Sequence, residues 1–190
     1  MIVAGIDYSM SCPAIVVGDI NAKFEDLQFY SFAKKKKQIS IKSQIHLWQY
    51  PLYKSPEERF DLISTIVIDT LKKSGVEYCM MEGYSYGSRN GKVFEIAENT
   101  AMIKHKMSKS DIPFEVVPPT VVKKKFCGRG TATKEVMYMY FRDKHCPYEI
   151  HHAIGILNIP LKIGNPVSDM IDAYAIWLLA RDKMLPIVNK

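Results

Sequence analysis

The sequence predicts an α/β fold in which helices cover both faces of a mixed five-stranded sheet. Two observations support this prediction. Three short apolar runs follow one another at the start of the chain with brief turns between them, which indicates an antiparallel meander. Beyond them, apolar runs of strand length alternate with segments of helical periodicity, which indicates strands connected through helices. With 190 residues, 47% of them hydrophobic, the chain is long enough for one domain with a substantial core.

The first three strands are predicted over 1–9, 13–18 and 26–32, where apolar residues dominate or alternate with polar ones. The segment 34–53 that follows has no clear periodicity and begins with four consecutive lysines. We expect an insertion or a loop at the edge of the sheet there.

Two further strands are predicted over 77–82 and 114–117, and helical spacing of apolar residues marks the segments around them. Ser55 precedes Pro56-Glu57-Glu58, which is the pattern of an N-cap followed by proline at the first helical position. The predicted helices cover 56–75, 93–108, 132–144 and 168–183.

Four acidic residues lie where a buried carboxylate would be costly. Asp7 ends one apolar run and Glu82 ends another, while Asp169 and Asp172 open the very apolar segment 170–180. An ionised carboxylate in apolar surroundings is unfavourable unless it is paired, protonated or bound to a metal. Converging carboxylates also repel one another, and a hard divalent cation relieves that repulsion. The sequence therefore predicts a Mg²⁺ site at strand ends and a helix start.

The acids lie in three short motifs, Gly5-Ile6-Asp7-Tyr8-Ser9, Met81-Glu82-Gly83 and Asp169-Met170-Ile171-Asp172. The basic stretch Pro119–Lys134 lies between the last two motifs, and in it lysines flank a Gly-x-Gly sequence. In order and rough spacing, these motifs resemble the RuvC-type Holliday junction resolvases, a family with a ribonuclease-H-like fold. The resemblance covers nearly the whole chain.

The resemblance implies hydrolysis of a phosphodiester bond with two Mg²⁺ ions, for which Mn²⁺ can substitute. Asp7, on the central strand, would bridge both ions, and Glu82 on the neighbouring strand would hold one. Asp169 and Asp172 are three residues apart, so they share one helix face and can reach the same ions. The family sometimes has a histidine where this chain has Asp169.

Basic residues between the second and third acids complete the implied site. Lys123 and Lys134 match the basic pair of the family and would act near the scissile phosphate. Lys124, Lys125 and Arg129 would add phosphate contacts that position the duplex without recognising its sequence.

The implied substrate is branched double-stranded DNA, above all the four-way junction. Cutting a junction symmetrically requires two active sites, so a homodimer is expected. The apolar stripe of the helix over 93–108 is mainly core, and its exposed part is the expected dimer face, as in the family. Tyr84 and Tyr86, which follow the second acid, are the candidates for stacking on bases at the junction.

Other functions fit parts of the same pattern. A broader debranching nuclease or a nuclease that cleaves RNA–DNA hybrids would have the same fold. Gly5-Ile6-Asp7 also resembles the first phosphate loop of actin-like ATPases and sugar kinases, but those enzymes need two lobes and this chain is short. A DNA-binding relative without catalysis is disfavoured because all four acids are intact.

Composition adds weaker constraints. The formal net charge of +6 favours a polyanionic partner. Four cysteines without a C-x-x-C pair indicate a reducing compartment and no structural zinc, and His151-His152 is expected at the surface or in packing. No apolar stretch is long enough to span a membrane and no signal peptide is evident, so the expected location is the cytoplasm, or that of the host for a viral protein.

Overall fold

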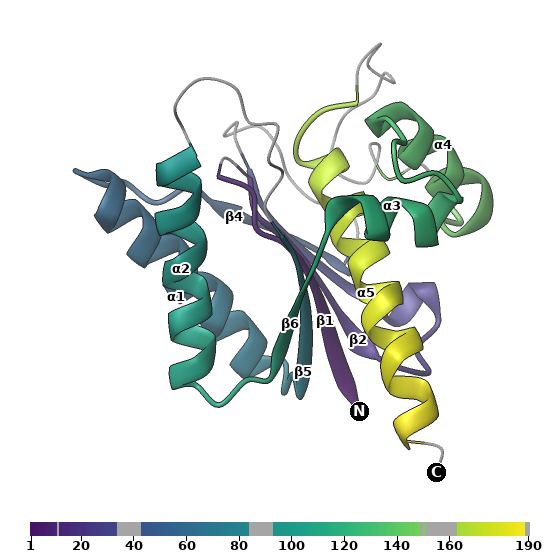
Figure 1. Cartoon of the computed structure of the whole chain (residues 1–190), viewed down its shortest axis with the longest axis horizontal. Helices are drawn as coiled ribbons and strands as arrows, with labels where there is room; N and C mark the ends of the chain where they lie inside the picture. Colours follow the sequence, from purple (N-terminus) through teal and green to yellow (C-terminus); the bar gives the residue numbers. More distant parts are fainter. Residues whose placement is uncertain (11, 34–42, 84–92, 149, 151–162, 189–190) are drawn as a thin grey trace.

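The chain forms one mixed sheet whose strands lie in the order β4-β3-β2-β1-β5-β6, with helices on both faces (Figure 1). A computed structural model describes residues 1–10, 12–33, 43–83, 93–148, 150 and 163–188. The strands are β1 (Ile2–Asp7), β2 (Ala14–Asp19), β3 (Gln28–Ala33), β4 (Ile45–Gln49), β5 (Tyr78–Glu82) and β6 (Phe114–Val117). The helices are η1 (Phe24–Asp26, 3₁₀), α1 (Pro56–Lys73), α2 (Val93–Lys109), α3 (Pro119–Cys127), α4 (Lys134–Lys144) and α5 (Val167–Val188).

The predicted α/β class, the mixed sheet and the opening meander are confirmed. β1 pairs antiparallel with β2 and β2 with β3, whereas β5 lies parallel to both β1 and β6. Parallel neighbours end at the same edge of a sheet, so the carboxyl ends of β1, β5 and β6 lie together.

The sheet has six strands rather than five, because part of the segment 34–53 is the edge strand β4, parallel to β3. Ile45 is buried opposite Phe29, and the ring of His46 stacks on Tyr30 with 4.6 Å between centroids. Trp48 also stacks on Tyr30, at 5.4 Å. Pairing with β3 and aromatic packing hold this strand in place, and neither is visible as periodicity in five residues.

Helices α1 and α2 pack on one face of the sheet, and α3, α4 and α5 cover the other (Figure 1). Ser55 caps α1 by accepting a hydrogen bond from the backbone N–H of Glu58, as its sequence predicts. Thr133 caps α4 in the same way. These caps satisfy N–H groups that a helix start leaves unpaired.

Two helices differ from prediction. The nine-residue α3 was not predicted, since only Val122 and Phe126 of it are buried and the lysines between them hide the pattern. α5 continues to Val188 instead of ending near 183, with Pro186 inside its last turn. Within the part of the chain that the structure describes, no helix is long and apolar enough to cross a membrane.

Cys12, Cys79, Cys127 and Cys146 form no disulfide in the part of the chain that the structure describes. Four sets of residues singled out from the sequence lie outside the described residues: the lysines 34–37, Tyr84, Tyr86 and the pair His151-His152.

Candidate active site

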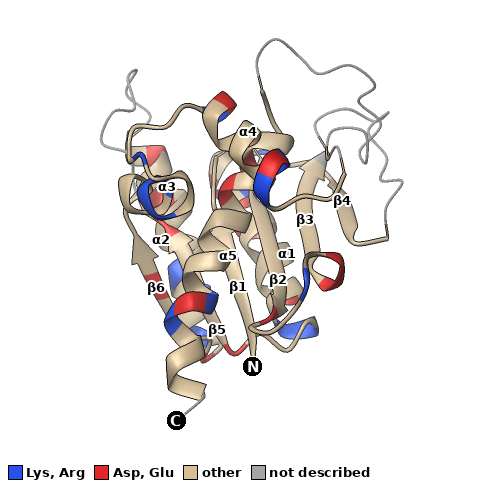
Figure 2. Ribbon diagram, turned by 90° about the vertical axis from the view of Figure 1, so that its right-hand side faces the viewer, with Lys and Arg blue, Asp and Glu red and all other residues tan. Residues whose placement is uncertain are grey.

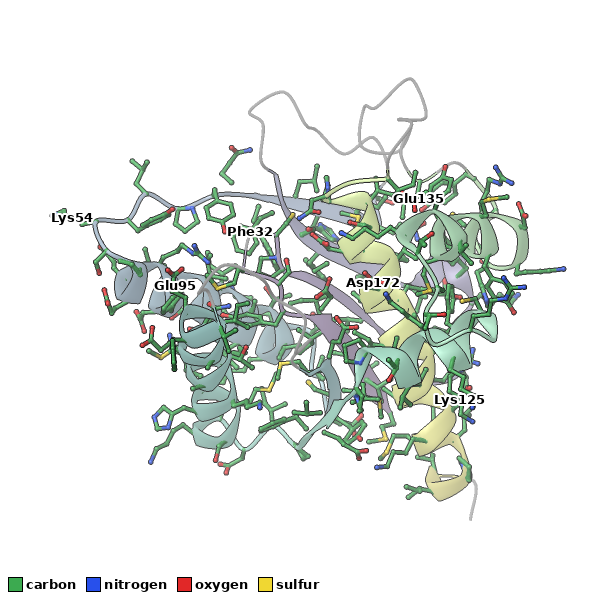
Figure 3. All side chains as sticks on the ribbon, turned by 45° about the horizontal axis from the view of Figure 1, so that its top comes forward. Phe32, Lys54, Glu95, Lys125, Glu135 and Asp172 are labelled. Carbon is green, nitrogen blue, oxygen red and sulfur yellow. The ribbon has the colours of Figure 1, made fainter. Side chains whose placement is uncertain are left out.

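The four predicted acids meet at the carboxyl edge of the sheet. Ile6 of β1 pairs with Met81 of β5, so Asp7 and Glu82 are the next residues on adjacent parallel strands. The first two turns of α5, which carry Asp169 and Asp172, reach the same place, and each of these acids acts electrostatically on another member of the group. Figure 3 shows Asp172 at this end of α5.

Gly5 allows α5 to lie directly on β1. A Cβ atom at this position would overlap the backbone of Ala173 and Trp177. Ala173 follows Asp172, so the close approach also fixes the height of this carboxylate above β1. Only glycine leaves room for such an approach of two backbones.

Burial is the largest cause of a raised pKa at each of the four carboxyl groups. The pKa of Glu82 rises to about 7, and those of Asp169 and Asp172 rise to about 6. The pKa of Asp7 is raised well above its usual range, by burial first and then by the charges of Asp169, Glu82 and Asp172. The group is therefore a cluster of buried negative charges that disfavour one another.

Lys123 and Lys134 approach this cluster from the other elements on the same face. Lys123, on α3, lowers the pKa of Glu82 and Asp172, against the larger effect of burial. Lys134, at the start of α4, acts in the same direction on all four acids, Asp7 and Asp169 included. Both lysines predicted from the basic stretch thus lie within electrostatic reach of the carboxylates.

The remaining predicted basic residues lie elsewhere. Lys124 and Arg129 are exposed at the surface of α3 and in the turn after it. Lys125 lines a separate hollow beside the second half of α5, apart from Asp172 (Figure 3). The stretch therefore divides into two lysines that act on the acids and three cations that do not.

Ser168 is a site residue that the sequence reasoning missed. Its buried hydroxyl accepts a hydrogen bond from Lys134 Nζ at 3.1 Å and lies 3.2 Å from Asp169 Oδ1 and 3.3 Å from Asn165 Oδ1, to which it can donate. It thereby connects a lysine to an acid on a different element. A serine beside an acid at a helix start is common, so its spacing gave no signal.

The residues present fit a divalent cation. Asp169 Oδ2 is buried and has no hydrogen-bond partner among the described residues. Carboxylate oxygens are the ligands that Mg²⁺ prefers, and a cation would offset the burial and repulsion that raise the pKa values here. In the described ranges, no three His, Cys, Asp or Glu side chains are already arranged as a metal-binding group.

Solved structures resemble this fold along nearly its whole length. RuvC from Thermus thermophilus matches with a TM-score of 0.60 and 19% sequence identity, covering 98% of this chain and 97% of that one. The same protein in complex with a Holliday junction substrate gives 0.59 and 16%, covering 97% and 96%. This chain has the RuvC fold. The yeast mitochondrial Holliday junction resolvase Ydc2 has a similar fold too, with a TM-score of 0.54 and 16% identity over 98% of this chain and 81% of that one.

The RuvC fold confirms the ribonuclease-H-like architecture expected from the motifs. Neither the protein-family models nor the curated proteins contain a match to the sequence. At these identities the likeness establishes the fold, and the chemistry rests on the residues themselves.

Proposed function

We propose that the protein is a divalent-metal-dependent endonuclease that cleaves branched DNA, with the four-way junction as its main substrate. The observation that supports this most strongly is the convergence of Asp7, Glu82, Asp169 and Asp172 on one edge of a RuvC fold. Two of the solved relatives are described as Holliday junction resolvases or as bound to junction DNA.

The four carboxylates would hold two Mg²⁺ ions, which Mn²⁺ can replace. The ions would supply a nucleophilic water and charge stabilisation at the leaving oxygen. Asp7 ends β1, next to β5, and the charges of the other three acids all act on it, so it is the acid best placed to serve both ions. Lys123 and Lys134, which act electrostatically on the cluster, would stabilise the negative charge that develops on the phosphate. Ser168 would hold the side chains of Lys134 and Asp169 in position relative to each other.

The decisive experiment is cleavage of a synthetic four-way junction by the purified protein with Mg²⁺, with Mn²⁺ and with EDTA. Asp7→Asn should bind the junction at least as tightly as the wild type and should not cut it, because Asn keeps the shape and loses the charge. Undiminished cleavage by Asp7→Asn would remove the site assignment.

The same assay separates the rival activities. Flaps and three-way branches cut as fast as the four-way junction would make a debranching nuclease the better description, and cutting of RNA–DNA hybrids would indicate a hybrid nuclease. An actin-like ATPase requires two lobes, and the described residues form one sheet.

A homodimer is part of this proposal, and the exposed side of α2 is its expected interface. Val93 is 51% and Phe94 79% exposed, and a largely apolar hollow of about 450 Å³ lies between α1 and α2 next to Met102. Ile103 and Met107, the other end of the predicted stripe, are buried against the sheet and α1 and therefore serve the core.

The oligomeric state tests this part directly. Phe94→Glu should convert a dimer to a monomer in light scattering and should turn paired cuts of a junction into single nicks. Met139→Glu, at a 52% exposed position of α4, is the matched control and should leave the dimer intact. A wild-type protein that stays monomeric with junction DNA would remove the dimer and favour the debranching activity.

A further inference from the structure

A second basic feature lies on the far side of α3 from the acids. It is a hollow of about 480 Å³ between the end of α3, the end of α4 and the second half of α5, which we call the α3–α5 pocket. Its charged lining is Lys125, Arg181, Asp182 and Lys183. Three cations against one acid make it a site for an anion.

The charges of this pocket are only partly neutralised within the chain. Arg181 bonds its sequence neighbour Asp182 at 2.7 Å, but 63% of the Asp182 side chain is exposed, so the pair is weak. Lys183 pairs with Glu115 of β6. Among the described residues Lys125 has no acidic partner. The pocket therefore keeps a net positive charge that a ligand can use.

Rings give the pocket a fixed wall. His145 stacks on Phe126 with 5.1 Å between centroids, and its Nδ1 lies 3.2 Å from the hydroxyl of Tyr174. The guanidinium of Arg181 lies 5.5 Å from the centre of the Trp177 ring, which limits its freedom. Because a planar guanidinium that is held in place loses little entropy on binding, it suits recognition of a phosphate.

α3 carries cations both at the acids and at the pocket. Lys123 faces the carboxylates, Lys124 is exposed beside it, and Lys125 reaches the pocket. From Asp172 to Arg181 the distance along α5 is roughly 14 Å at 1.5 Å per residue. That is about four base-pair steps of 3.4 Å along a duplex. Figure 2 shows the basic residues in the lower half of α5, away from its first turns.

We propose that the α3–α5 pocket binds a backbone phosphate of the DNA arm that carries the scissile bond, about four base pairs from the cut. This inference rests on the proposed nuclease function. Cations at the acids, on the surface of α3 and in the pocket favour a polyanion over a free anion, because a single phosphate could contact only one of these places. The pocket would fix the angle of the arm and add no sequence preference.

The test uses Asp7→Asn protein, so that binding is measured without cutting. Lys125→Ala with Arg181→Ala should reduce the slope of log affinity against log salt by about 0.9, since the pocket holds one phosphate and each lost phosphate contact removes about that much. The control is Lys72→Ala with Lys73→Ala, two exposed lysines at the end of α1 on the other face, which should leave the slope unchanged. Lys125→Glu is a second variant that leaves the Arg181 contact with Trp177 intact; it changes the charge of the pocket by the same amount and should also weaken binding.

Neutral methylphosphonates placed one at a time along the arm locate the contact. In the protein with an intact pocket, affinity should fall about fivefold to tenfold at one or two positions near the fourth base pair. The pocket double variant should show no loss there. Equal losses in both proteins, or an unchanged salt slope, would overturn the proposal.

Inorganic phosphate separates the two sources of this chemistry. Titration with millimolar phosphate could shift the NMR signals of the His145 ring in the wild type and not in the pocket double variant. If the two proteins also bound the junction with equal affinity, the pocket would be assigned to a free anion and the DNA contact would be overturned. A wild type that binds no branched DNA would refute the proposed function, and the phosphate titration would then still report on the pocket alone.

Discussion

The pKa values of acidic residues are shifted in opposite directions at the two ends of α5. At its start, Asp169 and Asp172 are surrounded by other acids, and burial raises their pKa to about 6. Further along, Lys183 bonds Glu115 at the surface, and this hydrogen bond lowers the pKa of Glu115. One helix thus carries a cluster that opposes folding and a pair that favours it mildly. An arrangement that opposes folding is typical of functional sites, which supports the proposed site at the helix start.

The largest difference is expected between the variants Asp172→Asn and Glu115→Gln, which each remove one acid near an end of α5. Loss of one carboxylate from the cluster should lower cleavage by at least about 10³-fold, equal to about 4 kcal/mol of barrier. Glu115→Gln should leave cleavage within about twofold and cost at most about 1 kcal/mol of stability, the range of exposed ion pairs. Single-turnover cleavage and urea unfolding measure the two effects. A loss of cleavage in Glu115→Gln would contradict the view that only the start of α5 serves catalysis.

Lys134→Ala should give the next largest effect. This lysine lowers the pKa of the surrounding acids, and its ammonium would face the phosphate. Turnover should fall about 10²-fold to 10³-fold, as when one stabilising donor of a transition state is removed, while junction affinity changes little. Lys124→Ala, at an exposed position on the neighbouring α3, should reduce affinity without this loss of turnover. Equal binding losses from both variants would show that Lys134 only anchors the DNA.

The metal-free protein should be more stable at pH 5.5 than at pH 8. Glu82, Asp169 and Asp172 have folded pKa values of about 7, 6 and 6, above those of the unfolded chain. Between roughly pH 4 and 7 the folded state therefore binds more protons, and stability falls as pH rises. We expect a loss of several kcal/mol across this window.

Millimolar Mg²⁺ should recover most of that loss at pH 8 and little at pH 5.5, because the cation and the protons compensate the same charges. Thermal unfolding followed by circular dichroism, with EDTA or Mg²⁺, measures both. A flat profile in EDTA would show that the carboxylates are better solvated than the structure indicates. In Glu115→Gln the profile should keep its shape, since that acid is not in the cluster.

Much of this architecture was predictable because its signals are local. α1, α2 and α4 begin and end within about two residues of the predicted bounds, since one apolar face defines each of them and the cap Ser55 marks the start of α1. β4 and α3 were missed for the opposite reason. The strand depends on its partner β3, and the helix has only Val122 and Phe126 to anchor it.

The acids of the site were predictable, and their supporting contacts were not. Asp7 and Glu82 each interrupt an apolar run at its end, which is unusual enough to notice in a sequence. Their proximity depends on the parallel pairing of β1 with β5, which only the resemblance to the RuvC-type resolvases had implied. Ser168 acts through a contact across 34 residues, to Lys134, and Gly5 through contact with α5. Such pairings arise only when helices dock.

The smallest effect expected, and the sharpest test of how the start of α5 is organised, is Ser168→Ala. The serine hydroxyl accepts from Lys134 and can donate to Asp169, so its loss releases both side chains while removing no charge. Cleavage should fall only about tenfold, or about 1.4 kcal/mol, and the Mg²⁺ concentration for half-maximal rate should rise. Ser168→Thr, which keeps the hydroxyl, should recover most of the rate.

Ser64→Ala is the matched control, because Ser64 is also fully buried but lies on α1, on the opposite face of the sheet. It should leave the Mg²⁺ dependence unchanged even if it lowers stability. A merely structural role for Ser168 would make the two alanine variants alike, with lower stability and an unaltered Mg²⁺ requirement. A shift confined to Ser168→Ala would mean that the acids at the start of α5 are held in position by a neutral hydroxyl, where the other end of the helix uses an ion pair.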